Sequence, residues 1–178
     1  MNALSMIQQA VLFFHLIAFA LTLSAVLRED WRLLTTRRVD GPRLARTARV
    51  AALGLAALWF TGLALVAIDM ATAPAPWLPS AKLQAKLIVV SVLTANGWGL
   101  HTWVFPRLWH ISGTLIERAL LPAAALGAIS SASWVYASFV GVARVVSPWL
   151  SFAGFMALYG VVIGVSLVLA TTSARRLA

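Results

Sequence analysis

Polar residues recur at regular intervals within an apolar stretch near the start of the sequence, and a histidine is among them. They lie seven positions apart, at Gln8, His15, Thr22 and Glu29. Because positions seven apart lie along one face of a helix, the spacing predicts that His15 points into the protein. A neutral imidazole in such a place can ligate haem iron, bind another metal or relay protons. The alternative is a hydrogen bond across the bundle to a Ser, Thr or Tyr, and Tyr159 lies at a similar depth.

A second apolar stretch carries basic, polar and small residues at helical spacing, namely Lys82, Lys86, Thr94, Gly97 and His101. We predict that this face also turns inward. Lys86 either snorkels toward the lipid headgroups or stays within the protein, where it would attract a carboxylate or a haem propionate. Asp69 is its candidate counter-ion.

His15 and His101 are the candidate metal ligands, and one hypothesis is that they bind the same haem b from opposite faces. Gly97, one helical turn before His101, would leave flat space for a porphyrin. Counted from the expected helix starts, His15 lies 11 residues deep and His101 lies 17, a difference of about 9 Å at roughly 1.5 Å per residue. The candidate cofactor-binding set is His15, His101, Lys86 and Gly97, and whether both histidines share one site stays open.

Five apolar runs are long enough to position these residues in a membrane. Crossing the hydrocarbon core takes about 20 mainly apolar residues in a helix, because lipid cannot satisfy an open backbone group. The composition agrees, with 61% hydrophobic residues and a mean hydropathy of +0.90. We predict a single all-α domain over residues 1–178, a polytopic membrane bundle whose five transmembrane helices span about 4–27, 50–68, 84–105, 119–142 and 148–170.

The positive charges predict how this bundle is oriented, because Lys and Arg are retained on the cytoplasmic side. Eleven arginines fall in the first loop, the third loop and the C-terminal tail, at Arg28, Arg32, Arg37, Arg38, Arg43, Arg46, Arg49, Arg107, Arg118, Arg175 and Arg176. The opposite side has only Lys82, Lys86 and Arg144. We therefore expect the N-terminus outside, the C-terminus in the cytoplasm and a multi-pass protein of the bacterial inner membrane.

Several classes of function are disfavoured by what the sequence lacks. The net charge of +9 comes mainly from loop arginines, which meet anionic lipid headgroups, so the lipid bilayer is the expected partner and nucleic acid is not. With no cysteine, the chain has no disulfide and no thiolate chemistry. No carboxylate is expected inside the membrane, since Asp69 and Glu117 fall at helix ends. Without a paired general acid and base, catalytic residues stay unassigned, and whether the protein is an enzyme stays open.

The same residues resemble a family of small membrane proteins related to HemJ and CopD. The resemblance covers roughly residues 10–105. It is carried by His15, by the stretch Trp59-Phe60-Thr61-Gly62-Leu63-Ala64-Leu65, and by Lys82-x-x-x-Lys86-Leu87-Ile88-Val89-Val90 leading to Asn96 and His101. HemJ is a haem-associated protoporphyrinogen oxidase in which a first-helix His and a third-helix Lys matter, which implies roles for His15 and Lys86. Residues 20–32 lack the Gly-Leu-x-Tyr-Leu-Pro-Arg type of sequence expected after that His, so haem binding is the better-supported expectation than the oxidase reaction.

Three interpretations of function follow. The leading one is a haem b protein that handles electrons or porphyrin, with His15 as ligand and Lys86 or loop arginines at the propionates. The second, in line with CopD and its link to copper uptake, is a permeation protein for copper or another small solute that uses His15, Met70, His101 and Met156. The third is an accessory subunit of a larger membrane complex or a homo-oligomer, with the Gly/Ser faces of the last two helices as contact surfaces.

Overall fold

The computed structural model is all-helical across the residues it describes, which are 3–36, 40–72, 78–106 and 115–175. The helices are α1 (Ala3–Thr36), α2 (Gly41–Thr72), α3 (Ala81–Gly99), η1 (Leu100–Val104), α5 (Leu115–Val142) and α6 (Phe152–Arg175). Within these residues, five helical segments are long and apolar enough to cross a membrane. The predicted class, a bundle of five membrane-spanning helices, is thereby confirmed.

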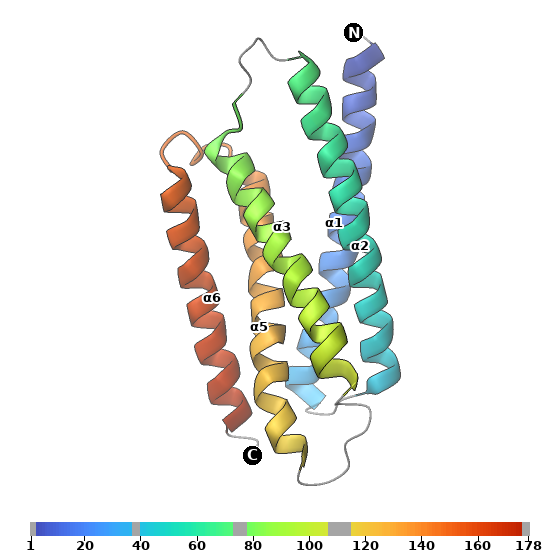
Figure 1. The fold of residues 1–178 in the computed structure, drawn as a ribbon, viewed down its shortest axis with the longest axis vertical. Helices are drawn as coiled ribbons and strands as arrows, with labels where there is room; N and C mark the ends of the chain where they lie inside the picture. Colours follow the sequence, from blue (N-terminus) through green and yellow to red (C-terminus); the bar gives the residue numbers. More distant parts are fainter. Residues whose placement is uncertain (1–2, 37–39, 73–77, 107–114, 176–178) are drawn as a thin grey trace.

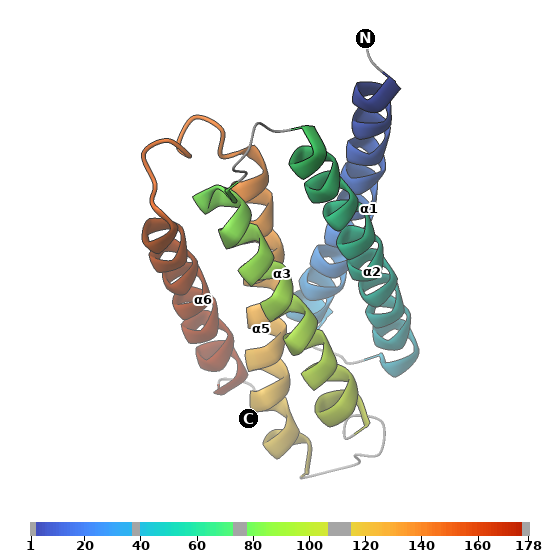
Figure 2. The ribbon, with the colours of Figure 1, turned by 45° about the horizontal axis from the view of Figure 1, so that its top comes forward.

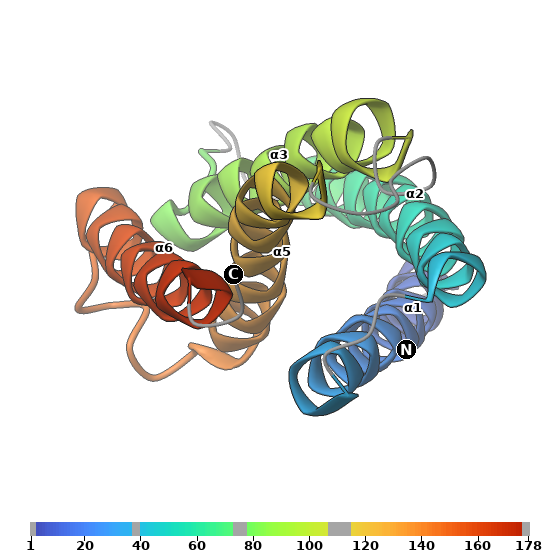
Figure 3. The ribbon, with the colours of Figure 1, turned by 90° about the horizontal axis from the view of Figure 1, so that it is seen from below.

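The helices run alternately down and up the long axis of the bundle (Figure 1). α1 packs mainly on α2, and α5 packs mainly on α6. α3 lies between these two pairs and contacts both, as the views from the tilted side and from below also show (Figures 2 and 3). α3 therefore joins the two halves of the bundle, together with a direct contact between α1 and α5.

The basic side chains fall into two groups at opposite ends of the bundle. The end of α1 and the start of α2, at the bottom of Figure 1, carry Arg28, Arg32, Arg43, Arg46 and Arg49. At the top, the start of α3 carries Lys82 and Lys86, and the end of α5 leads to Arg144. Arg37, Arg38, Arg107 and Arg176 lie outside the described residues. The predicted separation of charge agrees with this arrangement, whereas the side of the membrane that each end faces stays a prediction.

α1 and α2 are much longer than the apolar runs at 4–27 and 50–68 predicted. The arginine-rich segment is helical on both sides of a short connection, because Arg, Leu and Ala are good helix formers and need no lipid to stay helical. α2 begins at Gly41, followed by Pro42, a residue that suits the first turn of a helix. Asp40 caps this end, since its Oδ1 accepts a hydrogen bond of 3.2 Å from the Arg43 amide.

Serine caps set the starts of two further helices. α3 begins at Ala81 rather than 84, because Ser80 Oγ accepts from the Leu83 amide at 3.2 Å. α6 begins at Phe152 rather than 148, and Ser151 Oγ accepts from the Gly154 amide at 3.2 Å. α5 begins at Leu115, four residues before the expected start at 119.

The third membrane span changes its winding near its end. α3 is followed directly by η1, a π-helical segment in which the Phe105 amide bonds the Leu100 carbonyl. Val104 and Phe105 are then buried against Ala48 of α2. π-Helical turns are rare and occur often at functional sites. The continuous helix expected over 84–105 is therefore interrupted where His101 lies.

The core is centred on one face of α3. Ala85, Val89 and Leu93, spaced by four, are almost fully buried and pack with Tyr136 of α5 and Phe155 of α6. Since van der Waals packing replaces the hydrophobic effect between helices in lipid, this close contact holds α3 to the α5–α6 pair.

α1 and α2 approach each other closely at Gly54. A Cβ atom built on Gly54 would lie 1.8 Å from Thr22 Oγ1, so only glycine fits there. Thr22 is itself 2% exposed and donates its hydroxyl hydrogen to the Ala18 carbonyl at 2.7 Å. The small residue allows the two backbones to come together, as is usual between helices in membranes.

Candidate functional site

His15 is oriented by a hydrogen bond between α1 and α2. Its Nδ1 lies 2.7 Å from Thr61 Oγ1. The Thr61 hydroxyl donates its single hydrogen to the Ala57 carbonyl at 2.6 Å, so it can only accept from His15. Nδ1 therefore carries the hydrogen, and Nε2 keeps a free lone pair. A metal-ligating histidine needs this state, with one nitrogen held by an acceptor and the other open.

Gly62, the residue after Thr61, lies beside the imidazole. A Cβ atom on Gly62 would lie 3.5 Å from His15 Cε1, which is ordinary contact. The Trp59 to Leu65 stretch therefore lies alongside His15, but in the middle of α2 rather than at its end, since the helix continues to Thr72.

Tyr159 is not the partner of His15, and that expectation is wrong. Its hydroxyl lies 2.7 Å from Ser133 Oγ on α5, and its ring stacks on Tyr136 with the centroids 4.9 Å apart. Tyr136 in turn donates to the Phe155 carbonyl at 2.6 Å. These aromatic residues join α5 to α6, on the far side of α3 from the histidine.

Lys86 on α3 lies close enough to His15 for its charge to act on the imidazole. The side chain is half-buried, and its ammonium group makes no hydrogen bond or ion pair within the described parts of the chain. Lys82, one turn earlier, instead donates to the Gly141 carbonyl of α5 at 3.3 Å. A charged amine in a membrane-spanning helix needs a partner, so Lys86 is available to an anionic group.

A polar hollow of 280 Å³ lies at this end of the bundle, lined by Asp69, Leu78, Ser80, Lys82, Leu83 and Lys86. Asp69 shares the hollow with Lys86 but, among the described residues, forms no ion pair with it. Its Oδ1 accepts from Gln8 Nε2 at 2.8 Å, which ties the top of α1 to α2. The predicted counter-ion is therefore near Lys86 but has another partner.

His101 and Gly97 lie elsewhere, at the junction of α3 and η1. His101 is exposed, its Nδ1 lies 2.9 Å from the Gly97 carbonyl, and its ring packs edge-on against Phe105 with the centroids 5.2 Å apart. A carbonyl only accepts, so Nδ1 donates and Nε2 is again free. A Cβ atom on Gly97 would meet nothing within 4 Å, so the space next to this turn is open.

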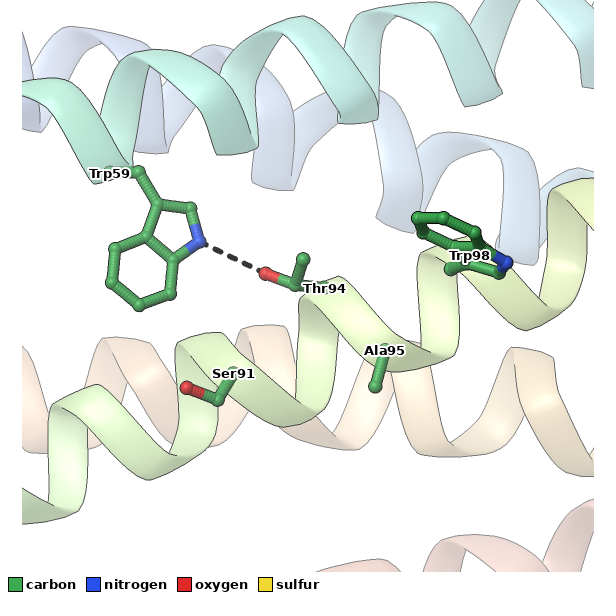
Figure 4. A pocket seen from close by; sticks show the side chains of 5 residues that line it. All are labelled: Trp59, Ser91, Thr94, Ala95 and Trp98. Atoms are coloured by element: carbon green, nitrogen blue, oxygen red, sulfur yellow. Dashed lines mark hydrogen bonds between the residues drawn. The ribbon is translucent and has the colours of Figure 1, made fainter.

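The two histidines lie at different levels of the bundle. Trp59 Nε1 donates to Thr94 Oγ1 at 3.0 Å, which sets a common level for α2 and α3 (Figure 4). The residue bound to His15, Thr61, lies two residues above this bond, and His101 lies seven residues below it. At about 1.5 Å per residue, the levels differ by roughly 13 Å. The structure thus does not bring His15 and His101 to opposite sides of one iron.

An open, mostly apolar hollow of 490 Å³ surrounds the bond between Trp59 and Thr94. Ser91, Ala95 and Trp98 of α3 form the rest of its wall, and Figure 4 shows all five side chains. It is separate from the polar hollow beside Lys86.

The proposed copper ligands are also dispersed. Met70 is exposed at the end of α2, whereas Met156 of α6 packs against the core. No group of three or more His, Cys, Asp or Glu side chains that could hold a metal ion occurs in the part of the chain that the structure describes. A soft metal site would need several thioether or thiolate ligands close together.

Sequence reasoning missed a carboxylate in the bundle, because the first helix was expected to end near Leu27. Asp30 belongs to α1, and its Oδ2 lies within hydrogen-bond distance of the Ser131 hydroxyl of α5. The spacing of polar residues gave Asn96 no structural role, yet it is 7% exposed and donates to the Leu126 carbonyl at 3.0 Å. The spacing of Asn96 on the buried face of α3, seven residues after Val89, was the available signal.

Comparisons with protein families, with curated proteins and with solved structures found no match for this chain.

Proposed function

We propose that this integral membrane protein binds haem b, with His15 as an iron ligand. The observation that supports the proposal is the orientation of His15, whose Nδ1 is hydrogen-bonded to Thr61 while Nε2 has no hydrogen-bond partner among the described residues. This donor set fits haem, since a neutral imidazole is a common axial ligand of haem iron. Bound haem would supply one-electron chemistry, and the chain would supply its orientation.

Lys86 would bind a propionate of the same haem. It comes from a distant part of the sequence, yet it lies near His15, and it lacks a partner within the described residues. A carboxylate brought to this place would neutralise a charge that is costly to leave alone in a membrane. Lys82 and the polar hollow lie next to it, toward the end of the bundle.

His101 and Gly97 are assigned no part in this haem site, because they lie at another level of the bundle. This assignment makes His101 a matched control, since it is the other histidine of the described residues and has the same free nitrogen.

The test is the absorption spectrum of the detergent-purified protein, oxidised and reduced, after expression with ample haem supply. We expect a haem spectrum in the wild type, its loss in His15→Ala and its retention in His101→Ala. Thr61→Val keeps the shape of the side chain but removes the acceptor for His15. We expect it to weaken haem binding by roughly 10- to 100-fold, as the loss of such orienting partners does at other metal sites.

Haem titration into the purified variants measures these affinities. Lys86→Met should weaken haem binding without changing the absorption bands that depend on the iron ligand, because a propionate lies away from the iron. A colourless wild type, or a spectrum that survives in His15→Ala and disappears in His101→Ala, would contradict the proposal.

A second candidate, a subunit of a larger complex or a homo-oligomer, is favoured by the small residues of α6. Gly160 and Gly164 are exposed and would meet nothing within 4 Å if they carried a Cβ, so neither serves packing within the chain. Small residues four apart are the usual contact between membrane helices. Native electrophoresis of the wild type and of Gly160→Leu tests this candidate. A larger species that is lost in the variant would support it, and a monomer in both would exclude the homo-oligomer.

A further inference from the structure

The hydroxyl group of Ser131 on α5 has two oxygen neighbours and only one hydrogen. It contacts Oδ2 of Asp30 on α1, and it lies 3.0 Å from the carbonyl of Gly127, one turn earlier on its own helix. A hydroxyl hydrogen can be donated along one direction, and a carbonyl cannot donate at all. If both contacts are hydrogen bonds, the second hydrogen must come from Asp30.

Neighbouring serines on α5 indicate where the Ser131 hydrogen goes. Ser133 donates to the Ile129 carbonyl at 2.6 Å, and Ser138 donates to the Trp134 carbonyl at 3.1 Å. A bond to the carbonyl four residues earlier is thus the common state of a serine hydroxyl on this helix. Ser131 in the same state donates to Gly127 and presents a lone pair to Asp30.

The surroundings of Asp30 make an ionised carboxylate costly. Asp30 lies near the end of Ala3–Arg32 of α1, and Ser131 lies within Leu121–Val142 of α5, two segments that are long and apolar enough to cross a membrane. The Asp30 side chain is partly buried where it meets Ser131. A charge removed from water without compensation is expensive, and a neutral carboxylic acid is not.

Among the residues that the structure describes, no basic side chain forms an ion pair with Asp30. Its neighbour Glu29 is 8% exposed and is paired with Arg32 at 2.5 Å, so this arginine is engaged with another carboxylate. Residues 121–142 of α5 include no charged side chain. Arg28 of α1 and Arg46 and Arg49 of α2 are exposed.

We propose that Asp30 is a proton-binding group in the membrane-spanning bundle, neutral at pH 7, whose carboxyl O–H donates to Ser131. The ligand of this site is a proton, and its occupancy governs the contact between α1 and α5. That contact otherwise includes the rings of Phe19 and Trp134, with their centroids 5.7 Å apart. Release of the proton would remove this donor, and the polar link between the two helices would then require the Ser131 hydroxyl hydrogen to turn from Gly127 to Asp30.

Infrared difference spectroscopy of the full chain in lipid nanodiscs tests the proposal, because a protonated carboxylic acid has its own carbonyl stretching band. We expect one such band at pH 7 in the wild type and its complete loss in Asp30→Asn. Asp69→Asn is the matched control, since Asp69 is exposed and accepts from Gln8, and it should leave the band unchanged. A band that is absent at pH 7, or one that persists in Asp30→Asn, would overturn the proposal.

The unfolding temperatures of two variants provide a second test. The amide group of an asparagine at position 30 can donate to Ser131 as a protonated acid does, so Asp30→Asn should unfold in detergent at nearly the wild-type temperature. Asp30→Ala should unfold at a lower temperature. Equal destabilisation by both substitutions, including a failure of both to fold, would show that the negative charge is required and would overturn the proposal.

Discussion

Gly54→Ala should destabilise the protein strongly although it adds one methyl group. The added Cβ would lie 1.8 Å from Thr22 Oγ1, whereas ordinary contact begins at 3.4 Å. Rotation of the Thr22 side chain cannot relieve this overlap, because its Cβ atom is also only 2.9 Å away. α1 and α2 must therefore separate, by up to about 1.6 Å if Thr22 does not move.

The cost follows from comparison with other overpacked interiors. Inserting a methyl group into a well-packed site typically costs about 1–3 kcal/mol, and we expect the upper end here because two helix backbones must move. A loss of about 3 kcal/mol lowers the ratio of folded to unfolded protein by roughly a hundredfold. The same movement would lengthen the bond between His15 and Thr61, which lies seven residues away on both helices, so haem binding should weaken as well.

Denaturation of the detergent-solubilised variants measures the effect. Gly160→Ala is the control, since nothing lies within 4 Å of the added Cβ and the gain in helix propensity should make it neutral or slightly stabilising. Thr22→Ala combined with Gly54→Ala should recover part of the lost stability, because the closest atom is removed while the 2.9 Å contact remains. Wild-type stability in Gly54→Ala alone would refute the assigned crossing of α1 and α2.

Two further substitutions test the contacts of α5. Tyr136→Phe removes the hydrogen bond to the Phe155 carbonyl and should lower the free energy of unfolding by about 1 kcal/mol, measured by denaturation in detergent. Asn96→Leu should cost less than Asn96→Ala in the same assay. Asn96 Oδ1 is buried without a hydrogen-bond partner in the described residues, so the leucine removes an unsatisfied acceptor and keeps the volume, whereas alanine leaves a cavity.

The number and nature of the helices could be predicted because lipid imposes a simple rule. A run of about 20 apolar residues must be helical there, and the five runs stand out from the charges between them. Helix ends beyond the membrane follow no such rule. The segment from Arg28 to Arg49 reads as a loop by charge, yet most of it is helical, with the break close to Asp40.

The candidate site was predictable only within single helices. Spacing identified His15 and Lys86 as inward-facing, but it could not show that Thr61 is the partner of His15, because no pattern in the sequence gives the order of neighbouring helices. Tyr159 was chosen by depth alone and proved to bond Ser133 instead. Asp30 escaped notice for a related reason, since its partner is 101 positions away on α5.

The pairing of α1 with α2 has a consequence for how the protein is made. The bonds of Gln8 to Asp69 and of His15 to Thr61 both join residues that are synthesised before α3. The first two helices can thus satisfy these polar groups as a hairpin soon after they enter the bilayer, as stepwise assembly of inserted helices requires. Lys86 and Asp30 differ, because each depends on segments from other parts of the chain. His15 is thus oriented early by Thr61, whereas Lys86 and Asp30 reach their places only when the two halves of the bundle meet.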